Sequence, residues 1–200
     1  PRFTTVFAGQ PMEAAARQVR QAMGDTPLPW FVKPAREGSS FGVVRLEKAE
    51  QLPDALETAF QYGGKVVVEE GISGFEVGCA VLGGPNPVTG AVDAIRLAGG
   101  FFDYYEKYNL DSAQILVPAP LDEKEAGRVK QVALELYALF GCTGFARVDL
   151  FYTPQGKIVF NEINTIPGMT NHSRYPGMLA AAGMPFKAMV ANMLEQAVAV

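Results

Sequence analysis

Metal-binding and redox-active side chains are scarce in this sequence, which has one histidine and two cysteines in 200 residues. Cys79 and Cys142 lie far apart and lack the close spacing that zinc ligands show. Together with the chain length, this scarcity argues against a zinc site and against a small disulfide scaffold. We interpret both cysteines as packing residues of a reduced chain and expect a cytoplasmic location.

Long apolar runs and an excess of basic charge are also missing. No run approaches the roughly 18 apolar residues that span a bilayer, and no charged-then-apolar leader opens the chain. The 17 Lys and Arg against 21 Asp and Glu give a formal charge of −4, so we expect neither nucleic acid nor a membrane as partner. With 48% hydrophobic and 19% charged residues, the chain is not globally disordered.

Glycines and prolines, 21 and 14 in number, are dispersed and indicate short elements joined by tight connections. The hydrophobic periodicity predicts strands at 2–7, 30–33, 43–46, 66–68, 75–82, 88–97, 144–152 and 157–164, and helices at 11–23, 51–62, 122–140 and 178–198. This order, with few helices between runs of strands, predicts an α+β fold of two lobes that divide near residues 70–74.

The most informative pattern is a predicted hairpin in which residues 144–152 and 157–164 flank a turn. If Tyr152 pairs with Lys157, alternation along the strands places five side chains on one face. This set consists of Arg147, Asp149, Phe160, Glu162 and Asn164. A one-residue slip in the register would scatter them over two faces.

Carboxylates on an otherwise apolar hairpin need a positive partner when they are buried. Arg147 could supply it in a structural salt bridge, and this alternative stays open. The interpretation that we favour is a site for Mg²⁺ or Mn²⁺ with Asp149, Glu162 and Asn164 as its oxygen ligands.

Two further segments are compatible with nucleotide binding. Lys33 precedes a loop with glycines and serines, whose successive N–H groups could wrap a phosphate, although the loop is not a Walker motif and an ordinary hairpin turn is the alternative. Residues 67–76 leave a buried strand with carboxylates at Glu69, Glu70 and Glu76. They could contact a base and a ribose, or form an interdomain linker.

Four ordered blocks combine these features: residues 32–40, 69–76, 103–108, and Arg147 and Asp149 together with 161–170. In this combination the sequence resembles the D-alanine:D-alanine ligase family of the ATP-grasp superfamily, and most of all its vancomycin-resistance-type D-alanine:D-serine ligases. The resemblance covers essentially the whole chain. It implies an ATP-grasp fold with a small lobe at 1–72, a large lobe at 73–200 that carries the metal and second-substrate sites, and ATP between the lobes.

The resemblance also implies roles for individual residues. Those expected to bind ATP are Lys33, Glu69, Glu70, Ile72, Glu76, Phe101 and Lys107. Those expected to act in catalysis are Arg147 and Gly168 as oxyanion donors, Lys107 on the transferred phosphoryl group, and Tyr108 closing toward Ser39. The second-substrate pocket would include Ser173 and Arg174 beside Arg147 and Gly168, and the Mg²⁺ ligands would be Asp149, Glu162 and Asn164.

The implied reaction joins D-alanine to a second D-amino acid through an acyl phosphate, for peptidoglycan precursor synthesis or vancomycin resistance. The Ser-Arg-Tyr-Pro segment at 173–176 and the loop at Lys107 favour D-serine as the second substrate, with D-alanine next. The family's N-terminal domain has no counterpart in a chain that starts at Pro1, so we expect a piece of a longer ligase. Members of the family are often dimers, and the resemblance implies a homodimer for the full-length protein. Two alternatives stay open: a truncated fragment that binds Mg-ATP without full ligase activity, and an ATP-grasp ligase for another carboxylate.

Overall fold

The computed structural model describes residues 1–37, 41–96 and 114–198. It divides into two compact units, Pro1–Ile72 and Ser73–Val200. Each unit combines helices with an antiparallel sheet, so the predicted α+β class is confirmed. No helix among the described residues has the length and apolar character needed to cross a membrane.

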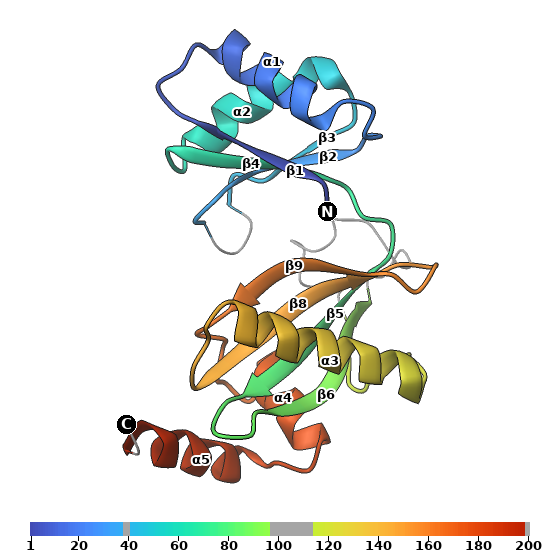
Figure 1. Cartoon of the computed structure of the whole chain (residues 1–200), viewed down its shortest axis with the longest axis vertical. Helices are drawn as coiled ribbons and strands as arrows, with labels where there is room; N and C mark the ends of the chain where they lie inside the picture. The colour runs from blue at the N-terminus through green and yellow to red at the C-terminus, as the bar shows by residue number, and fades with distance from the viewer. Residues whose placement is uncertain (38–40, 97–113, 199–200) are drawn as a thin grey trace. The chain divides into compact units, whose positions relative to one another are not determined.

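The first unit is built on a four-stranded sheet in the order β1-β4-β2-β3. Its strands are β1 (Phe3–Phe7), β2 (Trp30–Pro34), β3 (Val44–Leu46) and β4 (Lys65–Glu70). Its helices are α1 (Met12–Met23) and α2 (Leu52–Phe60), the second preceded by the short 3-10 helix η1 (Ala49–Gln51). Both α-helices cover the same face of the sheet (Figure 1). Alternate strand residues fill the core beneath them: Val6, Trp30, Val32, Leu46, Val66 and Val68.

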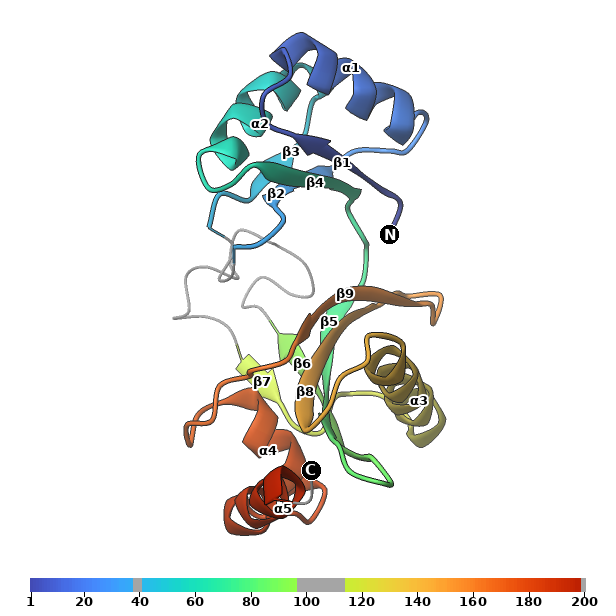
Figure 2. The same ribbon diagram turned by 60° about the vertical axis from the view of Figure 1, so that its left-hand side comes forward.

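The second unit is built on a five-stranded sheet in the order β7-β6-β5-β8-β9. Its strands are β5 (Phe75–Leu82), β6 (Val88–Arg96), β7 (Gln114–Leu116), β8 (Phe145–Tyr152) and β9 (Ile158–Asn164). Its helices are α3 (Glu123–Leu139), α4 (Arg174–Ala181) and α5 (Phe186–Val198). Helix α3 covers one face of the sheet, and α4, with α5 packed on it, covers the other (Figure 2).

The predicted elements are confirmed within a few residues, with two differences. Strand β7 is not among the predicted strands. The helical tail predicted at 178–198 is two helices, because α4 ends at Ala181 and the chain turns through Gly183, whose φ of +89° is left-handed, before α5 begins.

The register of the β8–β9 hairpin differs from the predicted one. Next to the turn, Tyr152 pairs with Ile158 and not with Lys157. A β-bulge between the pairs of Asp149 and Leu150 then shifts the register by one more residue. Because side chains alternate with a period of two, these two shifts cancel for the residues beyond the bulge.

Beyond the bulge, Asp149 pairs directly with Glu162, and Arg147 pairs with Asn164. The prediction that these four polar side chains share a face is therefore confirmed. The placement of Phe160 on the same face is wrong, since this ring packs with the hydrophobic core beneath α3. The bulge permits this arrangement by turning the aromatic ring to the apolar side and the carboxylate to the polar side.

Candidate metal and nucleotide site

A row of residues crosses four strands of the second sheet. In the strand pairing, Gly78 on β5 lies opposite Asp93 on β6 and opposite Asp149 on β8, and Asp149 lies opposite Glu162 on β9. Three carboxylates thus share one line, with a glycine between two of them. The neighbours of Asp93 along β6 belong to the core beneath α3, so the row lies on the other face, where α4 begins.

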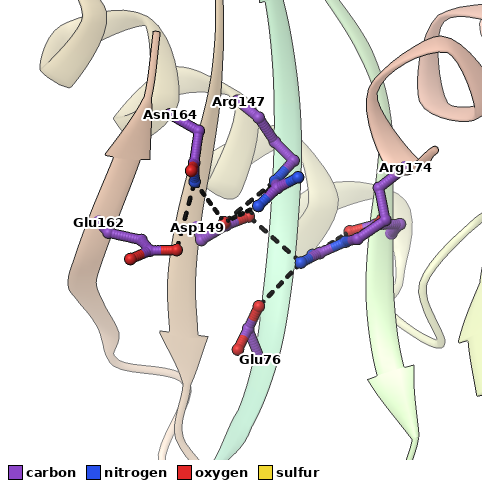
Figure 3. A network of polar contacts seen from close by, with 7 residues as sticks. Glu76, Arg147, Asp149, Glu162, Asn164 and Arg174 are labelled. Atoms are coloured by element: carbon purple, nitrogen blue, oxygen red, sulfur yellow. Dashed lines mark hydrogen bonds and ion pairs between the residues drawn. The ribbon is translucent and has the colours of Figure 1, made fainter. Parts of the chain in front are cut away.

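Asp149 is at the centre of the predicted metal site and is 1% exposed. Its Oδ1 and Oδ2 accept hydrogen bonds from Nε of Arg147 at 2.9 Å and from Nη2 at 2.6 Å, respectively (Figure 3). Asn164 donates from Nδ2 to Oδ2 of Asp149 at 2.9 Å and to Oε1 of Glu162 at 3.3 Å. The three predicted metal ligands therefore converge, and the predicted salt bridge with Arg147 is present beside them.

The donor set fits a hard divalent cation. Two carboxylates and one amide are the oxygen groups that Mg²⁺ accepts in proteins, and rotating the Asn164 amide would turn its oxygen toward the carboxylates. With Asp149 included, the network holds four carboxylates and two guanidinium groups, so negative charge is in excess. Among the described residues, no three Asp, Glu, His or Cys side chains form a group suited to a metal, so the site depends on the amide as its third donor.

Burial changes the ionisation of Asp149. Loss of solvent raises the pKa of its carboxyl group, and the positive charges of Arg174 and Arg147 oppose that rise. A cation close to the carboxylate would favour its charged form further. The guanidinium groups of Arg174 and Arg147 thus stabilise the charged form of the buried Asp149 carboxylate.

Arg174, predicted to border the second-substrate pocket, is almost entirely surrounded by carboxylates. Its side chain is 10% exposed, and Nε and Nη2 donate to the two oxygens of Asp93 at 2.8 Å each. Nη1 donates to Glu76 at 2.8 Å and lies 3.4 Å from Oδ1 of Asp149. Burial lowers the pKa of Arg174, but the hydrogen bond from Asp93 and the three negative charges outweigh that effect and raise it.

The loop between β9 and α4 brings Gly168 and Ser173 together. Oγ of Ser173 accepts a hydrogen bond from the N–H of Thr170 at 3.0 Å and lies 2.9 Å from its hydroxyl oxygen. A Cβ added to Gly168 would lie 2.7 Å from Oγ of Ser173, closer than such atoms approach. A residue with a side chain at 168 would therefore require the Ser173 hydroxyl to move.

Three of the predicted nucleotide residues of the first unit, Lys33, Glu69 and Glu70, lie on β2 and β4 at the centre of its sheet. Lys33 and Glu69 form an ion pair across the two strands. Glu70 instead accepts a hydrogen bond from the backbone N–H of Arg2 at 2.8 Å, and Ile72 ends the unit. Glu76, predicted to contact ribose, belongs to the second unit and pairs with Arg174, so its role toward a nucleotide stays a prediction.

Four of the predicted residues, Ser39, Phe101, Lys107 and Tyr108, lie outside the described residues. Two residues of the site were not predicted, namely Asp93 and Gly78. A signal for Asp93 is present in the sequence, because it is a lone carboxylate in an otherwise apolar part of its strand. Gly78 has no comparable signal, since a glycine in a strand has many explanations.

Comparisons with known proteins identify the family of the chain. A family model described as "D-ala D-ala ligase C-terminus" matches residues 1–195. The chain is 46% identical over 186 residues to the vancomycin B-type resistance protein VanB of Enterococcus faecalis, covering 88% of this chain and 54% of that protein. It is 42% identical over 196 residues to D-alanine–D-alanine ligase A of Escherichia coli, covering 98% and 53%.

Solved structures of ligases from this family superimpose on the chain. The VanG D-Ala:D-Ser ligase from Enterococcus faecalis superimposes with a TM-score of 0.86 at 46% identity, over 98% of this chain and 56% of that one. The D-alanine-D-alanine ligase from Coxiella burnetii gives 0.81 at 29% identity, over 98% and 51%. The ATP-grasp fold predicted from the sequence is therefore confirmed, and the chain spans about half the length of the relatives it matches.

Proposed function

The chain belongs to the D-alanine–D-alanine ligase family, and from this premise we propose that it is the ATP-grasp part of a ligase that joins D-alanine to a second D-amino acid. The observation that carries the proposal is the convergence of Asp149, Glu162 and Asn164 beside Arg147 on one face of the sheet. In this proposal the units Pro1–Ile72 and Ser73–Val200 are the small and large lobes. The cofactors are ATP and Mg²⁺, or Mn²⁺ in its place.

The proposed chemistry explains the choice of residues. A carboxylate resists attack by an amine, so the γ-phosphoryl group of ATP passes first to the carboxylate of D-alanine, giving an acyl phosphate and ADP. The amine of the second amino acid then attacks the carbonyl carbon, phosphate leaves, and the amine loses a proton. Both steps place negative charge on oxygen, which cationic groups and N–H donors stabilise.

Two groups of this chain are suited to that task. Arg147 holds its guanidinium beside Asp149, where it could donate to a phosphoryl oxygen or to the carbonyl oxygen under attack. The N–H of Gly168 could supply a second donor from the neighbouring loop. A bound divalent cation would shield the phosphate charges, held by Asp149, Glu162 and Asn164.

For the second substrate we propose D-serine, with D-alanine next. The support is the Ser-Arg-Tyr-Pro segment at 173–176 and the 46% identity to a structure described as a D-Ala:D-Ser ligase. Replacing Arg174 with Leu in the full-length ligase should change the ratio of D-serine to D-alanine use by about tenfold or more, because a site built around polar groups discriminates strongly. An unchanged ratio would remove Arg174 from this part of the proposal.

The central test is nucleotide binding by the chain, measured by calorimetry with ATP and Mg²⁺. Asp149→Asn and Glu162→Gln should each weaken Mg-ATP binding by about tenfold or more, since each removes a charged ligand. Glu195→Gln removes an exposed carboxylate from α5 and should leave binding unchanged. Failure of the unmodified chain to bind Mg-ATP would contradict the proposal.

Ligation is tested separately, by following dipeptide and phosphate release with D-alanine, D-serine, Mg²⁺ and ATP. Dipeptide formation identifies the ligase, and nucleotide binding without dipeptide identifies the truncated fragment. Phosphate release that depends on a different carboxylate would favour the other ATP-grasp ligase. Dimerisation of the full-length protein and a cytoplasmic location stay predictions.

A further inference from the structure

Gly78 is the one residue in the row of the second sheet that has no side chain, and the space it leaves is filled. A Cβ added to Gly78 would overlap Nη2 of Arg174 and lie 2.5 Å from Oδ1 of Asp93 and 3.2 Å from Oδ1 of Asp149. The guanidinium of Arg174 therefore lies directly over the backbone of β5. No other residue type would allow this approach without movement of the arginine.

The glycine is required by space and not by backbone conformation. Gly78 is in the regular part of β5, paired with strands on both sides, and it is not among the glycines with positive φ. An alanine could adopt this backbone. The effect of a substitution would thus be confined to the side chains that occupy the space above it.

Arg174, which lies over Gly78, contacts two carboxylates from different strands, Asp93 of β6 and Asp149 of β8. Asp93 is fully buried and receives two of its hydrogen bonds, so it anchors the guanidinium firmly. On the other side of Gly78, the same guanidinium lies 3.4 Å from Oδ1 of Asp149. Oδ2, the other oxygen of Asp149, is the one that Asn164 contacts, on the side of β9.

We propose that Gly78 is a positioning residue, which seats Arg174 between Asp93 and Asp149 and thereby holds the Asp149 carboxylate in the orientation that binds a divalent cation. The inference rests on the proposed function, because it assumes that Asp149 is a metal ligand. Groups that orient a metal ligand typically change metal affinity by about 10–100-fold when they are lost. An opposing effect is the loss of a nearby positive charge, which by itself would strengthen cation binding, and the orienting effect is expected to dominate.

The test measures the metal-dependent part of ATP binding, defined as the ratio of ATP affinity with Mn²⁺ to ATP affinity in EDTA. Gly78→Ala should lower this ratio by about tenfold or more and leave the affinity in EDTA unchanged. Gly83→Ala is the matched control. Gly83 directly follows β5, and its added Cβ would overlap the hydroxyl of Tyr137 on α3 and not the guanidinium of Arg174. This control should destabilise the fold and leave the ratio intact.

A double substitution shows whether Gly78 acts through Arg174. If it does, Gly78→Ala should have little further effect on the ratio in an Arg174→Gln background, whereas independent effects would multiply. Asp93→Asn, which keeps the space but weakens the anchor, should lower the ratio in the same direction and carries the test if Gly78→Ala does not fold.

The outcomes separate the two proposals. A ratio near one for the unmodified chain would contradict the metal site itself. If the unmodified chain has a high ratio that Gly78→Ala and Asp93→Asn leave unchanged or increase, only the positioning role is overturned. The same holds if the effects of Gly78→Ala and Arg174→Gln on the ratio multiply fully in the double variant.

Discussion

The two units use similar sheets in different ways. In the first unit both helices cover one face of the sheet, and the candidate pair Lys33 and Glu69 is only partly buried, with side-chain exposures of 26% and 15%. In the second unit helices cover both faces of the sheet (Figure 2). The ion-pair network around Arg174 there is buried, because Asp93 is 0% exposed and Asp149 is 1% exposed. The same kind of charged contact should therefore contribute to ligand binding in the first unit and to both binding and stability in the second.

The largest expected effect is the loss of one member of the buried network. Arg174→Met would leave Asp93 buried without a cation, and removing one partner of a buried ion pair costs about 3–5 kcal/mol. Lys33→Met, the matched change in the first unit, should cost about 1 kcal/mol or less, because the pair is partly solvated. Urea unfolding followed by circular dichroism measures both, and equal losses would contradict the contrast between the units.

A second prediction concerns binding in the first unit. Lys33→Met should weaken ATP binding by about 10–100-fold, the equivalent of losing one hydrogen bond to a charged group, at about 1.5–3 kcal/mol. Calorimetric titration with Mg-ATP is the measurement. Arg45→Met, which removes a partly exposed arginine on the neighbouring strand β3, serves as the control, and a comparable loss in that variant would show a general charge effect.

A smaller effect is expected at the start of α3. Asp122 accepts a hydrogen bond from the N–H of Glu125 at 2.7 Å, and Glu125 accepts one from the N–H of Asp122 at 3.0 Å. This reciprocal cap satisfies two N–H groups of the first turn, so Asp122→Ala should lower the free energy of unfolding by about 1 kcal/mol. Lys124→Ala, an exposed change in the same turn, should have almost no effect.

The last prediction compares the units without changing stability. Trp30, the only tryptophan, is buried in the first unit, and Cys79 is buried in the second, where loss of solvent raises the pKa of its thiol to about 12. Since the thiolate is the reactive form, Cys79 should resist alkylation at pH 8 until the second unit unfolds, while Cys142 reacts as the more accessible control. Following Trp30 fluorescence and Cys79 alkylation across urea reports each unit separately, and rapid alkylation of native Cys79 would contradict the packing.

Much of the fold was predictable because it depends on local periodicity. The helix faces and the strand alternation follow from the spacing of apolar residues, and the polar face of the β8–β9 hairpin follows from the same alternation. Phe160 is the exception, because it lies on the apolar face and not on the polar one. Its side is set by a bulge, and nothing in the turn sequence indicates an extra residue further along the strand.

In the candidate site, too, some residues follow from local sequence patterns and others are brought together only by tertiary packing. The sequence by itself determined the family resemblance and the set of Asp149, Glu162 and Asn164, because residues two apart on one strand share a face and the hairpin partner is close in sequence. Only the tertiary structure decided that Gly78 is the seat of Arg174 and that Asp93 anchors it. Arg174 and Asp93 are 81 residues apart, and their contact arises from the packing of α4 on the sheet, which no local pattern encodes.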